Sequence, residues 1–231
     1  MEDDSIDFVG TSPPYGKIRT YKGYKFDFPK LAHGLTRILK PGGVIAWNVM
    51  DETINGRESL DSCKQKIFFV EECGLWVHDT MIYQKLNFSH PETNRYHNVF
   101  EYVFIFSKGK PKTFNPIMDR ANKTAGEIGN RGINTFTLKD GSKSERSKKV
   151  TKDIGMRHNV WPGKTRGQEE GCKKLKHPAM MPKWLAHDLI LSFSNAGDLV
   201  YDPMAGSGTV CEQAERLGRR FIGSEISEAY A

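Results

Sequence analysis

The chain has few cysteines, and none of them is placed to form a recognisable metal site. Its 231 residues include four cysteines, without a Cys-x-x-Cys pair. Zinc sites built from cysteine need such closely spaced ligands, and disulfide frameworks need denser cysteine. We therefore expect reduced, structural thiols and no bound metal.

Long apolar runs and a basic leader are also missing. No stretch approaches the roughly 18 uninterrupted apolar residues of a membrane span. The first four residues, Met1 to Asp4, are acidic in character, whereas a signal peptide begins with basic residues. These absences favour a cytoplasmic protein. The length and the 38% hydrophobic content fit one globular domain with an insertion.

Positive charge is concentrated in one segment of the chain. Residues 108–176 contain 18 Lys and Arg against 7 Asp and Glu, whereas the remainder contains 16 against 21. A solvated or disordered loop explains this composition about as well as a segment that binds a polyanion. A polyanion is the more specific hypothesis, because Lys and Arg that neutralise phosphates release condensed counterions.

Helical and strand-like patterns alternate on both sides of this segment. The patterns predict strands at 6–10, 44–49, 76–86, 99–107, 198–201 and 220–223. They predict helices at 28–39, 61–73, 180–193 and 208–217. Such alternation is typical of a three-layer α/β fold with a mainly parallel sheet. Within the basic segment the periodicity is weak, so we expect an irregular insertion there.

A glycine turn lies between the strand at 198–201 and the helix that follows it. Its residues are Asp202, Pro203, Met204, Ala205, Gly206, Ser207, Gly208 and Thr209. The two glycines let the backbone approach a ligand, and Glu225 after the next strand can accept hydrogen bonds from ribose hydroxyls. The third glycine of the dinucleotide pattern is replaced by Cys211, and no Gly-Lys-Ser/Thr follows. The turn favours a nucleoside cofactor other than a hydride carrier, with helix packing as the alternative.

Two adjacent prolines end the strand at 6–10. The segment consists of Thr11, Ser12, Pro13, Pro14 and Tyr15. The prolines keep the backbone extended and leave carbonyls without a helical partner. The Ser12 hydroxyl, the Pro13 carbonyl and the flat Tyr15 ring suit a planar base that carries an amino group. A proline turn with a buried tyrosine is the alternative. The base-binding role predicts a corner that faces outward beside the glycine turn, and Pro13 packed in the interior or remote from that turn would overturn it.

Together the two motifs resemble those of the DNA amino-methyltransferases, in the class whose catalytic motif precedes the cofactor motif. Residues 11–15 resemble the family's (D/N/S)PP(Y/F/W) tetrad, and residues 202–209 resemble its DPFxGSGT loop, with Met204 where phenylalanine is usual. Further matches follow in the family's order: Leu39 to Gly43, Phe100 to Lys108, His177 to Pro182, and Phe221 to Glu225 with Tyr230. The resemblance implies a Rossmann-like, S-adenosylmethionine-dependent fold with a circularly permuted motif order.

The resemblance also implies the site residues and the domain plan. It implies a catalytic group of Ser12, Pro13, Pro14 and Tyr15. It implies cofactor contacts from Thr11, His177, Pro178, Ala179, the glycine turn from Asp202 to Thr209, and Glu225. It divides the chain into a catalytic half, 1–107, a target-recognition insertion, 108–176, and a cofactor-binding half, 177–231.

The implied reaction is methyl transfer from S-adenosylmethionine to the exocyclic amino group of a base rotated out of double-stranded DNA. The serine form of the tetrad favours cytosine N4. Adenine N6 methylation, an inactive DNA-binding protein, and methylation of RNA or protein are the alternatives. No cysteine follows a proline, which disfavours carbon-5 cytosine methylation. Asp51, just after a predicted strand, is a candidate proton acceptor or a turn residue.

One strand of related sheets has no counterpart in this sequence. The resemblance implies a further strand between the one that ends near Glu225 and the one that begins near Ile6. A truncated chain, an incomplete adenine edge of the cofactor pocket, or a strand from a partner subunit would each account for the difference. A homodimer is therefore among the expectations.

Overall fold

The structure is a computed structural model that describes residues 1–14, 26–88, 91, 93–127, 135–145, 150–169 and 180–227. The chain forms two compact units. Met1–Asn115 together with Asn159–Ala231 make up the main unit, and Pro116–His158 make up the second unit.

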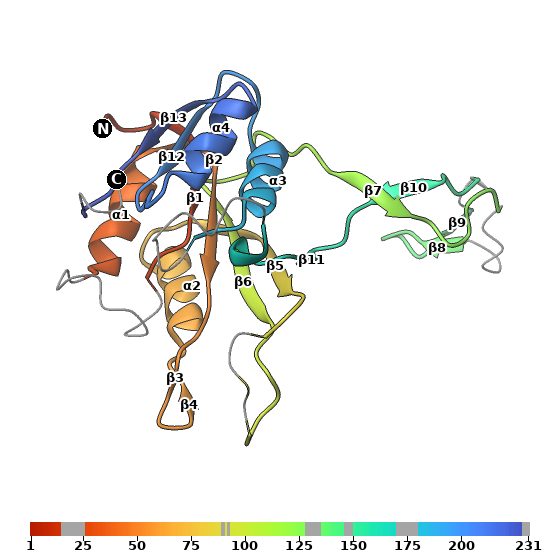
Figure 1. The fold of residues 1–231 in the computed structure, drawn as a ribbon. Coiled ribbons are helices and arrows are strands. Elements are labelled where there is room, and N and C mark those ends of the chain that lie inside the picture. Colours follow the sequence, from red (N-terminus) through yellow and green to blue (C-terminus); the bar gives the residue numbers. More distant parts are fainter. Residues whose placement is uncertain are drawn as a thin grey trace. The chain divides into compact units, whose positions relative to one another are not determined.

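A seven-stranded sheet lies at the centre of the main unit (Figure 1). Its strands, in spatial order, are β11 (Val160–Gly163), β5 (Trp76–Lys85), β6 (Phe100–Ser107), β2 (Leu39–Val49), β1 (Ile6–Thr11), β12 (Leu199–Asp202) and β13 (Arg220–Gly223). Within this described sheet, β6 alone runs antiparallel to its neighbours. The prediction of a mainly parallel sheet is therefore confirmed.

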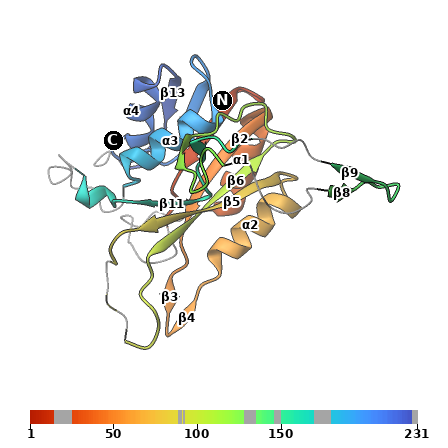
Figure 2. The ribbon, with the colours of Figure 1, turned by 90° about the vertical axis from the view of Figure 1, so that its right-hand side faces the viewer.

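Helices cover both faces of the sheet (Figure 2). On one face lie α1 (Phe28–Ile38) and α2 (Asp61–Glu71), and on the other lie α3 (Lys183–Phe193) and α4 (Thr209–Arg216). The predicted three-layer α/β fold is thus confirmed. None of the described helices has both the length and the apolar character that crossing a bilayer requires.

Helix α1 shows why these residues form this element. The Asp27 side chain accepts a hydrogen bond from the N–H of Lys30 at 3.1 Å, and Pro29 lies in the first turn, where proline is tolerated. The residues of α1 that face the sheet recur at helical spacing and are buried: Ala32, Leu35 and Ile38. A local cap and an apolar stripe therefore define the helix and the face that it buries.

The core between the sheet and the α1–α2 layer is organised around Trp47 of β2. Trp47 is fully buried, and its ring meets Phe28 and Phe69 edge to face, with centroid distances of 5.8 and 5.2 Å. The indole N–H donates to Gln65 Oε1 at 2.8 Å, so the buried donor is satisfied. Because Trp47 pairs with Thr11, this packing also holds the end of β1 in place.

Some element boundaries differ from the predicted ones. The strand β2 begins at Leu39 instead of Val44, because Leu39 pairs with Ile6 before an irregularity shifts the register. The helix α3 begins at Lys183 instead of Met180, directly after Pro182. A small hairpin follows β2 and consists of β3 (Thr53–Ile54) and β4 (Arg57–Glu58).

The predicted insertion contains more regular structure than its weak periodicity indicates. In the second unit, β7 (Met118–Ala121) pairs with β10 (Ile154–Met156), and β8 (Thr135–Thr137) pairs with β9 (Lys143–Glu145). Strands of three or four residues are too short to show a clear sequence period. Residues on either side of the second unit, including β11 and the 3₁₀ turn η1 (Arg166–Gln168), belong to the main unit.

The described sheet likewise lacks the further strand that has no counterpart in the sequence. Strand β1 pairs directly with β12, through Phe8–Val200 and Val9–Tyr201. Strand β12 in turn pairs with β13, which is the outermost strand on that side of the described sheet. Because β12 fills the position between β13 and β1, an additional strand could join this described sheet only outside β13.

Candidate active site

The two sequence motifs meet at the carboxyl ends of two neighbouring parallel strands. Thr11 and Asp202 are the last residues of β1 and β12. The Thr11 hydroxyl donates a buried hydrogen bond to Asp202 Oδ1 at 2.9 Å, across 191 residues of sequence. We call this end of the sheet the carboxyl edge. Ligands of open α/β sheets bind at such an edge.

Asp202 connects the strand end to the turn that follows. Its Oδ1 also accepts the backbone N–H of Met204 at 3.0 Å. Burial raises the pKa of Asp202 to about 7, and the nearby charge of Glu225 acts in the same direction, whereas hydrogen bonds from Met204 and Thr11 act against it. A buried carboxyl that titrates near neutral pH, shared by two motifs, is typical of a functional site.

The glycine turn leaves open space at the start of α4. Gly206 and Gly208 have φ values of 50° and 77°, a region that glycine adopts without strain. A Cβ added at Gly208 would meet no atom within 4 Å. Helix α4 begins at the next residue, and its N-terminal end carries partial positive charge. The turn therefore offers room and favourable polarity to a ligand.

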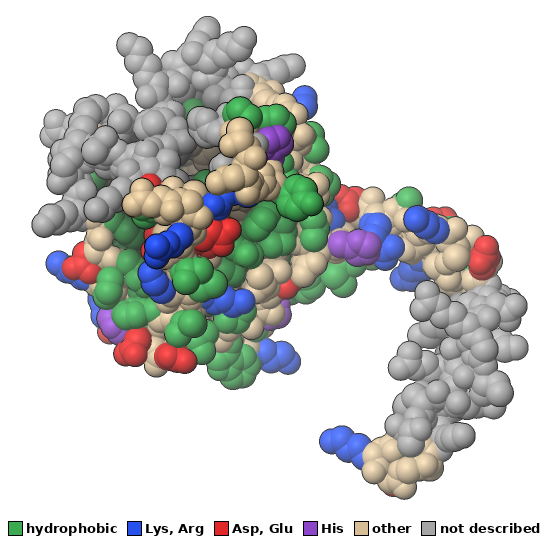
Figure 3. Space-filling model, turned by 90° about the horizontal axis from the view of Figure 1, so that it is seen from below, with side chains coloured by type: hydrophobic (Ala, Val, Ile, Leu, Met, Phe, Trp, Pro, Cys, Tyr) green, Lys and Arg blue, Asp and Glu red, His purple; other side chains and the backbone are tan. Residues whose placement is uncertain are grey.

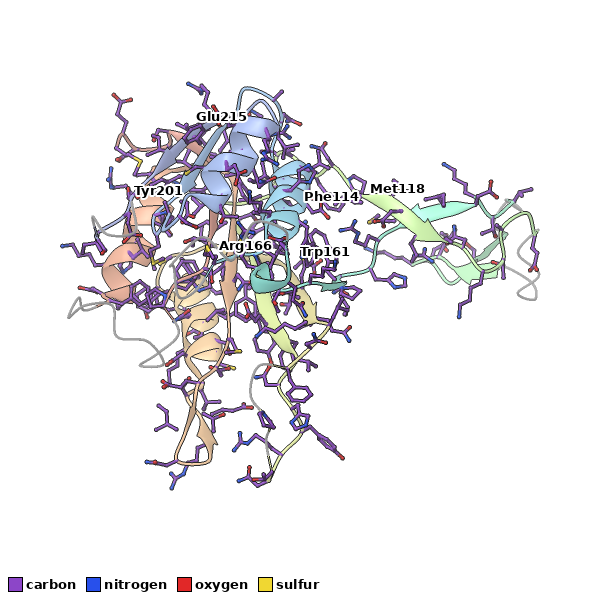
Figure 4. The ribbon with its side chains drawn as sticks, viewed as in Figure 1. Phe114, Met118, Trp161, Arg166, Tyr201 and Glu215 are labelled. Atoms are coloured by element: carbon purple, nitrogen blue, oxygen red, sulfur yellow. The ribbon has the colours of Figure 1, made fainter. Side chains whose placement is uncertain are left out.

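Glu225 reaches back from the end of β13 to the glycine turn. Its Oε2 accepts the N–H of Gly206 at 2.9 Å, and its Oε1 accepts the N–H of Ser227 at 2.9 Å. The hydroxyls of Tyr201 in β12 and of Ser224, just after β13, lie 3.1 Å apart (Tyr201 is labelled in Figure 4). A carboxylate has about four acceptor positions, so two backbone bonds leave capacity for ribose hydroxyls. These residues fit a nucleoside cofactor such as S-adenosylmethionine.

Gly223 lets β13 pass close to α4. A Cβ added there would lie 2.9 Å from Cys211 Sγ and 3.0 Å from Ala205 Cβ. Burial raises the pKa of the Cys211 thiol to about 11, so the thiol is neutral at pH 7. Cys211 is therefore a packing residue, and all three cysteines in the described ranges are free thiols.

The proline corner after β1 differs in part from the expectation. Ser12 and Pro14 are half-buried, but Pro13 is buried, as Thr11 is. The outward-facing corner that we predicted is thus wrong for the Pro13 ring. The reason is that the prolines keep the chain extended in line with β1, a central strand that is buried on both faces, so Pro13 is buried with it. Pro13 is not remote from the glycine turn, because Thr11, two residues before it, contacts Asp202 at the start of that turn.

Four predicted site residues lie outside the described residues. They are Tyr15, His177, Pro178 and Ala179. The structure brings together the predicted residues that it does describe at the ends of β1, β12 and β13.

Asp51 is bound to the start of α2. Its Oδ1 accepts the N–H of Ser62 at 2.9 Å and the hydroxyl of Ser59 at 3.3 Å, and its Oδ2 accepts the hydroxyl of Ser62. A carboxylate in this position satisfies N–H groups that the first helical turn leaves open. Of the two roles considered for Asp51, the structure supports the turn residue.

Sequence reasoning missed a polar cluster elsewhere on the carboxyl edge. Lys85 at the end of β5 and Glu101 at the start of β6 form an ion pair, and Glu101 also binds Asn48 near the end of β2. A lysine and a glutamate at the ends of apolar strands were the available signal. Their partnership could be inferred only with the strand order known.

A surface depression of about 600 Å³ lies beside the start of α3. It is lined by Pro162, Gly163, Lys164, Gln168, Glu169, Lys183 and Trp184. Glu169 already accepts the guanidinium of Arg166 at 2.9 Å and the N–H of Lys183 at 3.2 Å (Arg166 is labelled in Figure 4). None of the predicted site residues lines this depression, so the glycine turn remains the better cofactor site.

A family model described as a DNA methylase, for N6 and N4 methyltransferases, matches residues 6–231. The chain belongs to this family. It is a DNA methyltransferase, as the two motifs predicted. The family depends on S-adenosylmethionine, which confirms the predicted cofactor.

Individual relatives agree with this assignment. The chain is 45% identical to the orphan methyltransferase M.BamHII of Bacillus amyloliquefaciens over 232 residues, which cover 99% of this chain and 86% of the relative. It is 24% identical to the type II methyltransferase M.BglII of Bacillus subtilis over 241 residues, covering 100% and 62%.

Solved structures share the fold. The PvuII DNA methyltransferase, described as cytosine-N4-specific, matches with a TM-score of 0.71 and 21% identity, covering 99% of this chain and 78% of that one. The complex of M1.HpyAVI with S-adenosylmethionine matches with a TM-score of 0.59 and 20% identity, covering 98% and 85%.

Proposed function

We propose that this methyltransferase modifies the N4 amino group of cytosine in double-stranded DNA. The observation that carries the proposal is the hydrogen bond from Thr11 to Asp202, because it sets Ser12 beside the glycine turn. The serine form of the tetrad favours cytosine, and the PvuII enzyme of similar fold is described as cytosine-N4-specific. The target base has to leave the duplex, since a stacked and paired amino group cannot meet a methyl donor in line.

In this proposal the proline corner prepares the amino group for attack. An exocyclic amine is a weak nucleophile, because its lone pair is delocalised into the ring. The Ser12 hydroxyl and the Pro13 carbonyl accept its two N–H bonds and favour a more pyramidal nitrogen, while Tyr15 stacks on the base. In an extended chain the carbonyl points sideways from the side chain, so the buried Pro13 ring is compatible with this role. Alignment and electrostatic positioning supply most of the rate.

The cofactor-binding half holds S-adenosylmethionine, which supplies an electrophilic methyl group. Glu225 accepts hydrogen bonds from the ribose hydroxyls. Thr11 and the residues from Asp202 to Thr209 lie beside the methionine part, and His177, Pro178 and Ala179 contact its amino-acid end. The bond from Gly206 N–H to Glu225 supports this arrangement, because it ties the turn to the ribose acceptor.

The basic segment, 108–176, binds the DNA backbone. Its 18 Lys and Arg against 7 Asp and Glu are the support, since phosphate contacts dominate nucleic-acid affinity. On the described part of the face at which β2 ends, charges of both signs and hydrophobic side chains are interspersed (Figure 3). We place the enzyme in the cytoplasm. A homodimer compatible with the strand order would add a strand of the partner subunit outside β13.

The experiment is expression in a bacterial strain without DNA methylation, followed by single-molecule sequencing and mass analysis of nucleosides. The expected result is N4-methylcytosine at one fixed sequence, absent with Ser12→Ala. N6-methyladenine without N4-methylcytosine would reverse the base preference. Retention of DNA without cofactor binding or methylation would identify an inactive DNA-binding protein.

A further inference from the structure

A nearly buried ion pair lies on the carboxyl edge beyond the proline corner. Lys85 Nζ and Glu101 Oε1 are 2.8 Å apart, and the two side chains are only 11% and 13% exposed. The other carboxylate oxygen of Glu101 accepts a hydrogen bond from Asn48 Nδ2 at 2.5 Å. Lys85 Nζ also lies 3.5 Å from Met50 Sδ. Both members of the ion pair therefore contact the end of β2.

The register of the sheet brings this network alongside Ser12. Thr11 pairs with Trp47, and Ser12 and Asn48 are the next residues of their parallel chains. On the other side of β2, Asn48 pairs with Val103 of β6. Glu101 is two residues from Val103 and so lies on the same face of the sheet. Asn48 thus stands between the proline corner and the ion pair.

A stabilising role alone does not account for this ion pair. The cost of removing two charges from water offsets most of their attraction, and apolar replacements of similar volume commonly leave stability unchanged or higher. The pair also lies at the end of the sheet where the methylation site is assembled. Burial of charge at that position points to a contribution to the reaction.

The chemistry of Glu101 fixes the orientation of the Asn48 amide. Glu101 lies against the Lys85 ammonium group, and a carboxylate can only accept hydrogen bonds. The NH₂ group of Asn48 must therefore face Glu101, because the opposite orientation would set two oxygens against each other. Lys85 acts through Glu101 on a single amide at the end of β2.

We propose that Lys85 and Glu101 are positioning residues for methyl transfer, which act by holding Asn48 in one orientation beside Ser12. The inference rests on the proposed function of the proline corner. A fixed Asn48 keeps the end of β2 in place beside that corner, and in-line transfer depends on such alignment. Loss of the Lys85–Glu101 pair should therefore lower the rate of methyl transfer. Loss of the pair should leave cofactor affinity unchanged, because Glu225 and the glycine turn lie on the side of β1 opposite to Asn48 and the ion pair.

The decisive variant combines Lys85→Met with Glu101→Gln, which removes both charges at nearly constant volume. The new amide can present either end to Asn48, so the orientation is no longer fixed. Single-turnover transfer from radiolabelled S-adenosylmethionine to unmethylated phage DNA should fall by about 10-fold or more. Cofactor affinity measured by calorimetry should change by less than about twofold. An unchanged transfer rate overturns the inference.

The charge reversal Lys85→Glu with Glu101→Lys separates positioning from a structural role. The reversal retains an ion pair, so a purely structural role predicts that the melting temperature and the transfer rate recover together. An ammonium group only donates hydrogen bonds, so it draws the amide oxygen of Asn48 and reverses the amide. Positioning predicts a low rate at a restored melting temperature, and recovery of the wild-type rate contradicts it.

Lys40→Met is the matched control at the opposite end of the sheet. Lys40 Nζ lies 2.7 Å from both carboxylate oxygens of Asp7, which also accepts the N–H of Leu199. The transfer rate should be unchanged, and a loss equal to that of the Lys85 variants would overturn a role specific to the carboxyl edge. If the wild-type protein binds cofactor but transfers no methyl group, the proposed function fails with the inference. If wild type and double variant transfer equally, the inference alone fails.

Discussion

The ionisable side chains at the two ends of the central sheet differ in how far they are exposed to water. At the carboxyl edge, Asp202, Glu225 and Glu101 are buried or half-buried, and each accepts hydrogen bonds from another strand or turn. At the amino end, the Arg37–Asp3 ion pair faces water, with side chains 51% and 68% exposed, whereas the Lys40–Asp7 pair is partly shielded, at 36% and 16%. The carboxyl edge therefore holds the buried carboxyl of Asp202, and the amino end holds the most exposed of these ion pairs.

This difference distinguishes a site from a surface. An exposed ion pair contributes little to stability, because water screens it and the long side chains lose freedom. At the carboxyl edge, burial raises the pKa of Asp202 to about 7, and hydrogen bonds fix the directions of the shielded carboxylates, as binding and catalysis require. The proposal that the carboxyl edge is the methylation site thus has a physical basis in addition to the family relationship.

The largest effect is expected from the buried Asp202 carboxyl, on the pH dependence of the free energy of unfolding. Its pKa is about 7 in the folded chain against 3.8 for an ordinary aspartate, so the folded state holds the proton more tightly. The raised pKa of Asp202 therefore contributes up to about 4 kcal/mol to the free energy of unfolding. This contribution is complete below about pH 4 and is lost as the pH rises through 7. Asp202→Asn keeps an oxygen for Met204 N–H and should flatten this dependence. Urea unfolding at pH 5 and pH 8 measures it, and an equal slope in variant and wild type would contradict the buried-carboxyl assignment.

Ser12→Ala should cause the next largest effect. The variant loses an acceptor for the target amino group, so single-turnover methylation should fall by about 100-fold, or about 3 kcal/mol of transition-state stabilisation. Cofactor affinity should change little. The control at the amino end is Ser5→Ala, whose hydroxyl donates to Glu2 O at 2.7 Å on the surface. Full activity of Ser12→Ala would refute the role of this hydroxyl.

Glu225→Ala should weaken cofactor binding by about 30-fold, or about 2 kcal/mol, because charged hydrogen bonds to ribose and to Gly206 are lost. Calorimetry with S-adenosylmethionine measures the change. Glu225→Gln keeps one acceptor and should lose less. Wild-type affinity in the alanine variant would show that the ribose is held elsewhere.

The smallest effect is expected at the amino end. Arg37→Ala removes the exposed ion pair with Asp3 and should cost less than about 1 kcal/mol of unfolding free energy, with methylation unchanged. Thermal unfolding and a transfer assay are sufficient. A loss of methylation here would erase the distinction between the two ends.

Sequence reasoning found the parts of the site that are local. The proline corner and the glycine turn are short segments in which proline and glycine dictate the backbone, so their character could be read residue by residue. Glu225 could be placed because one helix and one strand separate it from the turn. The burial of Pro13 was not predicted, because β1 is buried on both faces and its sequence has no alternating pattern that would show which way the corner turns.

The remaining features depend on contacts between distant strands. The bond from Thr11 to Asp202 requires β1 to lie beside β12, and the Lys85–Glu101 pair requires β5 beside β6. Strand β11 has four residues and no usable period, and its position follows from pairing with β5. Tight packing also fixes the position of β11, since a Cβ added at Gly163 would lie 2.1 Å from the Trp184 ring. No single segment contains this information.

The pairing of β1 with β12 has a consequence for biosynthesis. The ribosome makes Phe8 long before its sheet partner Val200, and at about 5–20 residues per second the interval is roughly 10–40 s. During that interval β1 can pair only with β2, so its other edge has no native neighbour. Both the methyl-donor pocket and the protection of that edge from aggregation therefore arise together, once the last strands have been translated.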